Sequence, residues 1–118
     1  MLSKENRLQK KADFQRVFKL GKGLKSSFLY IKFLKTKNDL TRIGFVVSKE
    51  ISNKSNQRNR IKRMLRESAK KNFSLLEEGF DLVIVVLPEI KKNIKTIKGL
   101  KTQDFDIITV QAFKKIKN

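Results

Sequence analysis

The chemistry that this sequence offers most clearly is the binding of phosphate groups by arginine. Four of its seven arginines lie within the nine residues from 58 to 66, in the segment NQRNRIKRMLRES at 56–68, whereas lysine is the usual basic residue elsewhere. A planar guanidinium group can donate two parallel hydrogen bonds to phosphate oxygens and can stack on bases. The cluster therefore favours a surface for RNA or DNA.

The surroundings of this cluster are also strongly basic. Residues 49–71 contain nine lysines and arginines against Glu50 and Glu67, a local excess of +7. Like charges at helical spacing repel one another, so such crowding destabilises an isolated helix. Solubility alone would be served by alternating signs. We therefore favour a polyanion-binding surface over a merely solvated basic face.

The sequence lacks the side chains that most enzymes use for catalysis near neutral pH. It has no histidine and no cysteine, which excludes imidazole acid–base chemistry and thiolate nucleophiles. The closest acidic pairs, Glu77 with Glu78 and Asp104 with Asp106, are better explained by a turn and by a helix N-terminus than by a Mg²⁺ site. The GKG at 21–23 lacks the spacing of a phosphate-binding loop. No catalytic and no metal-binding residue is predicted.

The length and the total charge limit the class of protein. A chain of 118 residues fits one domain, residues 1–118. The formal charge of +18 indicates a polyanionic partner, with nucleic acid as the first choice. No run approaches the roughly 18 apolar residues of a membrane span, and no N-terminal stretch is typical of a signal peptide. We therefore expect a cytoplasmic protein with no membrane partner.

Hydrophobic periodicity predicts the elements of the first half. Phe14, Val17 and Phe18 recur at helical spacing before Gly21, so residues 13–20 are predicted to form a short amphipathic helix. Residues 21–26 are expected to be a loop. The apolar runs at 28–34 and 42–48 are typical of strands and can pair as a hairpin.

A long helix, a buried strand and a terminal helix are predicted in the second half. One apolar stripe predicts that the long helix begins after residue 55. The continuous apolar run at 80–87 predicts the most buried strand. Residues 89–101 are expected to form either a short helix or a loop. We therefore expect an α+β two-layer sandwich with a small four-stranded sheet, in the order α-β-β-β-α-β-α. The residue patterns locate three of these strands, at 28–34, 42–48 and 80–87, and leave the fourth without a position. The apolar stripe of the long helix consists of Ile61, Met64, Leu65, Ala69 and Phe73, and that of the terminal helix consists of Phe105, Ile108, Ala112, Phe113 and Ile116. In the terminal helix, Asp104 and Asp106 lie in the first turn and Lys114, Lys115 and Lys117 in the last.

Aromatic residues offer a second way to hold RNA. Phe14 and Phe18 lie one turn apart on the first predicted helix, and Tyr30 alternates with Phe28 and Lys32 on one face of the first predicted strand. Proteins hold single-stranded RNA by stacking unpaired bases on such rings beside a basic groove. Burial in an ordinary core explains any one phenylalanine at least equally well. The hydroxyl of Tyr30, by contrast, suits a cleft that is partly exposed to water.

Several of these residues together support a family resemblance. The run Arg58-Asn59-Arg60-Ile61-Lys62-Arg63, followed by Arg66-Glu67, resembles the RNR motif of the protein subunit of bacterial ribonuclease P. The similarity covers about residues 4–88 and includes Asn6-Arg7-Leu8, Asp13-Phe14, Val17-Phe18, Arg42-Ile43-Gly44 and Ser48-Lys49. In the C-terminal third, the similarity is limited to the presence of a final helix.

This resemblance implies a small protein that binds a large catalytic RNA and the 5′ leader of precursor tRNA, while the RNA performs Mg²⁺-dependent hydrolysis. Mg²⁺ would be bound mainly by the RNA subunit, no protein partner would be required, and the fold would contain a left-handed βαβ crossover. Phe14, Phe18 and Tyr30 would line a leader-binding cleft between the first helix and the sheet, although the sequence leaves open whether Tyr30 or Ile31 faces it. The implied RNA contacts are Lys49, Arg58, Asn59, Arg60, Lys62, Arg63 and Arg66.

The segment before the basic helix departs from the family pattern. Glu50 and Ser52 stand where many members have lysine and glycine, and the loop from Lys49 to Arg58 is slightly longer.

Two other function classes remain as alternatives. A structural RNA-binding protein of ribosomal type would share the basic charge and the small α+β form, but it does not account for the basic helix together with the paired phenylalanines. A metal-dependent protein nuclease ranks third. The resemblance therefore implies a protein component of ribonuclease P, the endoribonuclease of tRNA 5′ maturation, with the chemistry carried out by the RNA subunit.

Overall fold

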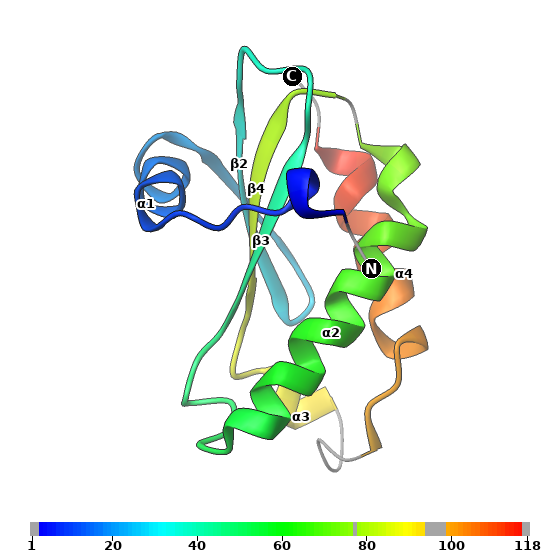
Figure 1. The fold of residues 1–118 in the computed structure, drawn as a ribbon. Helices are drawn as coiled ribbons and strands as arrows, with labels where there is room; N and C mark the ends of the chain where they lie inside the picture. Colours follow the sequence, from blue (N-terminus) through cyan, green and yellow to red (C-terminus); the bar gives the residue numbers. More distant parts are fainter. Residues whose placement is uncertain (1–2, 77, 94–98, 117–118) are drawn as a thin grey trace.

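A four-stranded mixed sheet forms the centre of the computed structural model, which describes residues 3–76, 78–93 and 99–116. Helices α2 (Ser55–Lys71) and α4 (Gln103–Lys115) cover one face of the sheet, and the short helix α1 (Lys11–Leu20) crosses the other face (Figure 1). This confirms the expected α+β architecture and the predicted order of elements. The predictions for Glu77, for Lys117 and for residues 94–98 lie outside the described residues.

The strand order is β1-β2-β4-β3, with β1 at Lys22–Ser26, β2 at Leu29–Lys35, β3 at Arg42–Val47 and β4 at Phe80–Val86. The prediction of a loop at 21–26 was wrong, because residues 22–26 form the edge strand β1. An edge strand pairs on one side only and tolerates the lysines and glycine that obscured it. In β1 only Leu24 and Ser26 turn partly or fully inward.

The predicted hairpin between the strands at 28–34 and 42–48, which are β2 and β3 in the structure, was also wrong. Strand β4 lies between β2 and β3, pairing antiparallel with β2 and parallel with β3. Its apolar residues are buried from both sides, as the continuous hydrophobic run predicted. Pairing β4 in the centre buries this run, whereas a β2–β3 hairpin would leave it at an edge.

The connection from β3 through α2 to β4 has an uncommon hand. In Figure 1 the chain runs down β3, up α2 and down β4, with β3 in front of β4 and α2 on the right. This path is left-handed, whereas nearly all βαβ crossovers are right-handed. The family resemblance implied this hand.

The helices bury the stripes that their periodicity predicted. Helix α2 spans Ser55–Lys71 and α4 spans Gln103–Lys115, and both pack on the sheet through fully buried side chains. Phe73 belongs to the 3₁₀ turn η2, Phe73–Leu75, rather than to α2. The shorter elements are α1 at Lys11–Leu20, α3 at Ile90–Asn93 and the 3₁₀ turn η1 at Lys4–Asn6.

A second, smaller core lies between α1 and the sheet. It contains the buried side chains of Leu8, Val17 and Val83, with Phe14 packed against them. Gly44 on β3 leaves room for the ring of Phe14, which a Cβ atom at this position would overlap unless the ring moved. This small core sets where α1 and its aromatic residues lie.

Candidate nucleic-acid interface

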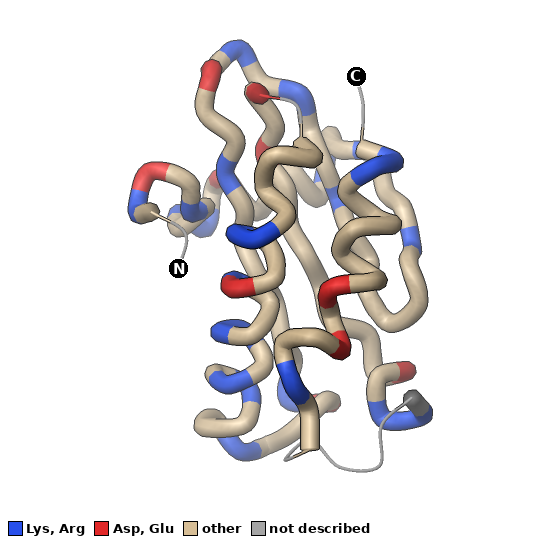
Figure 2. Tube along the Cα trace, turned by 90° about the vertical axis from the view of Figure 1, so that its right-hand side faces the viewer, with Lys and Arg blue, Asp and Glu red and all other residues tan. Residues whose placement is uncertain are grey.

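Helix α2 presents different basic residues to different surroundings. Its outward side carries Asn59 and Arg63, both exposed, while Lys62 is half-buried. Lysines and arginines recur along the length of the helix (Figure 2). The opposite side of α2 packs on the sheet, so Asn59 and Arg63 face outward, whereas Arg58, Arg60 and Arg66 are partly covered by other segments.

One side of α2 is occupied by the C-terminal segment. The Nη2 of Arg60 donates a 2.7 Å hydrogen bond to the backbone oxygen of Leu100, and the Nζ of Lys71 lies 3.0 Å from the Oδ2 of Asp106. Arg60, predicted as an RNA contact, therefore also connects two parts of the protein.

The loop before α2 holds Arg58 in place. The Nη1 of Arg58 donates a 2.9 Å hydrogen bond to the backbone oxygen of Ser52, and the hydroxyl of Ser52 donates to the Oε1 of Gln57 at 2.5 Å. Ser52 thus connects the loop to the first turn of the helix. Lys49 lies exposed at the start of this loop.

The three aromatic residues predicted to line a cleft all lie on the α1 side of the structure. Phe18 is 40% exposed, whereas Phe14 and Tyr30 are half-buried. Tyr30 shares its face of β2 with Leu34, which packs in the small core beneath α1. Ile31 points to the opposite face and is 0% exposed, so of the two residues it is Tyr30 that lies on the α1 side.

The rings of Phe14 and Tyr30 pack over different strands. Phe14 lies over Gly44 on β3, and Tyr30 lies over Gly23 on β1. Neighbouring strands are about 4.8 Å apart, and β4 separates β2 from β3, so the two rings are spread across the sheet. Phe28 does not belong to this face, because it lies before β2 and packs edge-on against Phe105 in the main core.

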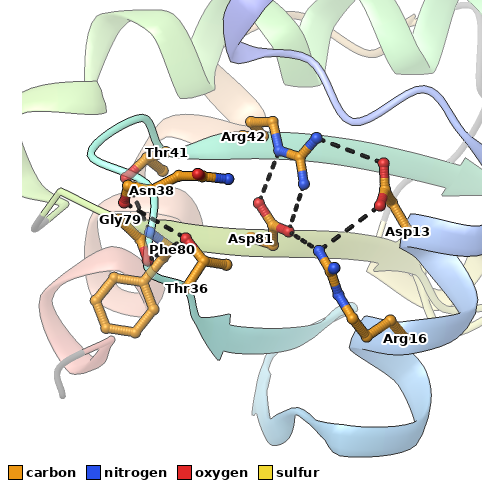
Figure 3. A network of polar contacts seen from close by, with 9 residues as sticks. All are labelled: Asp13, Arg16, Thr36, Asn38, Thr41, Arg42, Gly79, Phe80 and Asp81. Atoms are coloured by element: carbon orange, nitrogen blue, oxygen red, sulfur yellow. Dashed lines mark hydrogen bonds and ion pairs between the residues drawn. The ribbon is translucent and has the colours of Figure 1, made fainter.

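A buried ionic network holds α1 on the sheet (Figure 3). Asp81 on β4 is 0% exposed and accepts hydrogen bonds from Arg16 of α1 at 2.8 Å and from the Nε and Nη2 of Arg42 at 2.9 and 2.7 Å. Arg42 also approaches Asp13 of α1 at 3.4 Å. The pKa of Arg42 is raised, chiefly by its hydrogen bond to Asp81, although burial acts in the opposite direction.

The sequence analysis missed this network, although a signal was present. Asp81 is the one acidic residue inside the apolar run at 80–87. A carboxylate in a buried strand requires cationic or hydrogen-bonding partners. The sequence therefore implied a partner for Asp81, but only the fold shows that the partners come from α1 and β3.

The comparisons with known proteins agree with this geometry. The family model described as Ribonuclease P matches residues 2–108. A ribonuclease P protein component from Fusobacterium nucleatum is 34% identical over 112 residues, which cover 95% of this chain and 97% of the relative. One from Clostridium novyi is 38% identical over 104 residues, covering 86% and 91%. The chain belongs to the ribonuclease P protein family.

Solved ribonuclease P proteins share the fold as well. The protein from Thermotoga maritima superposes with a TM-score of 0.83 at 27% sequence identity, over 95% of this chain and 98% of that one. The Staphylococcus aureus protein gives a TM-score of 0.77 at 27% identity, over 98% and 100%. As a ribonuclease P protein component of bacterial type, the chain is part of a tRNA-processing ribonucleoprotein that contains an RNA partner.

The described part of this ribonuclease P protein offers neither a cluster of metal-ligating side chains nor a membrane-spanning helix. Within residues 3–76, 78–93 and 99–116, no three carboxylates, histidines or cysteines are grouped so that they could hold a metal ion. In the same described ranges, no helix is long and apolar enough to cross a membrane. The basic side of α2 and the aromatic side of α1 therefore remain the candidate surfaces.

Proposed function

We propose that this protein binds both the catalytic RNA subunit and the 5′ leader of precursor tRNA, in the cytoplasm and without a protein partner. The observation that carries the proposal is the separation of two surfaces by the sheet. Figure 1 shows α2 and α1 on opposite faces of the sheet. The basic residues belong to α2, whereas Phe14 and Phe18 belong to α1 and Tyr30 shares the face of β2 that packs beneath α1. Two surfaces of different chemistry suit two RNA segments, one held mainly by its phosphates and the other by its unpaired bases.

The protein's role in this proposal is to position RNA. Arg58, Asn59, Arg63 and their neighbours bind phosphates of the catalytic RNA, which brings the substrate-binding face of α1 to a fixed place in the complex. The aromatic side chains stack leader bases. Mg²⁺, held mainly by the RNA subunit, supplies the activation of water when it is bound. Positioning of this kind lowers the entropic part of the barrier without a catalytic side chain.

Reconstitution tests the proposal. The protein is combined with a bacterial ribonuclease P catalytic RNA, and cleavage of precursor tRNA is followed at a Mg²⁺ concentration too low for the RNA alone. We expect cleavage at the 5′ end of the mature tRNA only when both components are present. No stimulation by the protein would leave a structural RNA-binding role of ribosomal type, and cleavage by the protein alone would support a metal-dependent nuclease.

Phe18→Ala tests the aromatic surface separately. We expect weaker binding of precursor tRNA with a leader, by roughly tenfold if one base loses its stacking partner, and no change for mature tRNA. Leu20→Ala is the matched control, since Leu20 lies on the same helix and is 61% exposed. Equal losses for both tRNAs would instead assign Phe18 a packing role.

A further inference from the structure

A hollow of about 320 Å³ lies at the end of the sheet where the parallel strands β3 and β4 begin, and neither RNA surface includes it. Its lining comes from η1, from the loop between β2 and β3, and from the chain between η2 and β4. Figure 1 shows this loop and the start of β4 together at the top, whereas α2 begins at the bottom. The hollow therefore lies away from the first turn of α2, which carries Arg58 and Asn59.

Backbone contacts hold together the two segments that form the rim of this hollow. Gly79 has a φ of +85°, and a Cβ atom there would lie 2.7 Å from the backbone oxygen of Asn38. The Nζ of Lys35 donates a 2.7 Å hydrogen bond to the backbone oxygen of Glu78. Asp39 follows Asn38, and Glu78 precedes Gly79. The side chains of Asp39 and Glu78 therefore belong to two segments in direct contact, which a glycine at position 79 allows to approach closely.

The charge of the hollow is opposite to that of the whole chain. The chain has 29 lysines and arginines against 11 acidic residues, yet Asp39 and Glu78 are the only charged residues among the described residues of the lining. Both are exposed, and no ion pair between described residues includes either carboxylate. These two carboxylates repel a phosphate and attract a cation, so the chemistry of the hollow does not suit RNA.

Apolar side chains accompany the carboxylates. Leu40, Phe73 and Leu76 line the hollow, and Leu40 is 46% exposed. Leu75, next to the lining residue Leu76, is 39% exposed. Large apolar side chains that remain exposed beside a hollow are typical of a surface that contacts another protein. A ligand that fits both parts of this lining must combine an apolar stem with a positive charge, as the long basic side chains do.

We propose that this hollow is a docking site for a basic protein, which inserts one arginine side chain into it. The stem of that arginine packs on Leu40 and Leu76. Its guanidinium group stacks on the half-buried ring of Phe73 and donates to Asp39 and Glu78. Arginine suits the site better than lysine, because its planar fork can serve two carboxylates and stack on a ring at once. This contact goes beyond the proposed function, which needs no protein partner.

A peptide titration tests this docking site. The probe is the capped tripeptide acetyl-leucyl-arginyl-leucinamide, and its binding to the isotope-labelled chain is followed by NMR. We expect the backbone amide signals that shift to belong to residues lining the hollow. Asp39→Asn and Glu78→Gln should each weaken binding of the peptide roughly threefold, because each removes one exposed charge partner. Shifts on α2 or α1 instead of the hollow would overturn the proposal.

The matched control variant is Glu50→Gln, which removes one negative charge at an exposed position beyond the other end of β3. It should bind the peptide as the unchanged protein does. A second peptide carries citrulline, which keeps the shape of arginine without its charge, and it should bind about fivefold more weakly. Melting temperatures show that each variant is folded. If Asp39→Asn and Glu78→Gln behave as Glu50→Gln does, or if the citrulline peptide binds equally well, the site is disproved.

Binding of the catalytic RNA separates this site from the RNA surfaces. Asp39→Asn, Glu78→Gln and Glu50→Gln should have the same RNA affinity, because each removes one negative charge and none of them contacts RNA. A larger gain for the two hollow variants would mean that RNA lies against the hollow, which overturns the proposal. The peptide titration contains no RNA. Failure of the peptide to bind therefore rejects only the docking site, whereas failure of the unchanged protein to bind RNA rejects only the proposed function.

Discussion

Arg60 and Arg63 lie one turn apart on α2 but have different surroundings. Arg63 is exposed, whereas Arg60 is half-buried and donates to the backbone oxygen of Leu100. Both were predicted as RNA contacts from the same motif. A motif specifies side-chain chemistry, while the side of the helix that is covered by another segment depends on packing.

Substitution of these two arginines should therefore have different consequences. Arg63→Gln is expected to weaken binding to the catalytic RNA and lower the salt slope by about one, with no change in stability. Arg60→Gln should also lower the free energy of unfolding, by about 1–2 kcal/mol, because the oxygen of Leu100 loses a charged donor. Salt titrations and urea unfolding measure the two effects. Equal stability of the variants would show that the Arg60 contact contributes nothing in solution.

At the scale of elements, α1 depends unusually on charge for its attachment. Val17 is its only fully buried residue, so hydrophobic burial alone holds the helix weakly. Arg16 and Asp13 connect α1 to Asp81 and Arg42 on two different strands. The network therefore fixes the helix that carries Phe14 and Phe18.

Asp81→Asn tests this attachment. Replacing the buried carboxylate by an amide removes the negative charge and turns one of the two acceptor oxygens into a donor facing the guanidinium groups, so the free energy of unfolding should fall by about 3 kcal/mol. The control is Glu89→Gln, which breaks the exposed ion pair with Lys25 and should cost less than about 1 kcal/mol. Chemical denaturation measures both. A loss at Asp81 no greater than that of the control would show that the network does not hold the helix.

The contact between α2 and α4 should depend on pH. Burial tends to raise the pKa of Asp106, but hydrogen bonds from Ser68 and Lys71 outweigh it, and the pKa lies below its ordinary value. The carboxylate therefore stabilises the fold above the unfolded pKa, near 3.9, and this contribution is lost as the pH falls through the lower folded pKa.

Asp106→Asn should remove that part of the acid dependence. The variant is expected to be less stable than the unchanged protein at pH 7, and the difference should shrink below about pH 4. Urea unfolding at several pH values measures it, with Asp39→Asn in an exposed loop as the control. A difference that stays constant down to pH 2 would mean that Asp106 acts through packing rather than through its charge.

At the scale of the whole molecule, the formal charge of +18 opposes folding. Salt screens repulsion between exposed charges, whereas the buried pairs at Asp81 are screened less. Between about 0.01 M and 0.15 M salt, where the Debye length falls from about 30 Å to about 8 Å, the melting temperature of the free protein should rise while RNA affinity falls.

The melting temperature and the RNA affinity should therefore change in opposite directions as salt is added. Calorimetry and binding titrations over one salt series measure them. A variant with Lys4→Glu and Lys37→Glu, both at exposed positions, should show a smaller rise. A melting temperature that falls with salt would mean that surface ion pairs outweigh the repulsion.

The amino-acid sequence by itself determined the chemistry of this protein and most of its elements. Arginine density, the helical stripes of α2 and α4 and the apolar run of β4 depend on residue type and local spacing, and all can be read along the chain. The left-handed crossover followed from the family resemblance and not from these patterns. The edge strand β1 escaped prediction because its pairing with β2, and not its own composition, makes it a strand.

Only the tertiary structure decided how distant residues meet. Insertion of β4 between β2 and β3 brings Asp81 to Arg42, and packing of α1 adds Arg16 and Asp13. The same packing turns Tyr30 rather than Ile31 toward α1 and places Arg7 near Arg66. Each of these contacts joins residues separated by many positions in the chain. Their closeness depends on strand order and register, which local propensity does not specify.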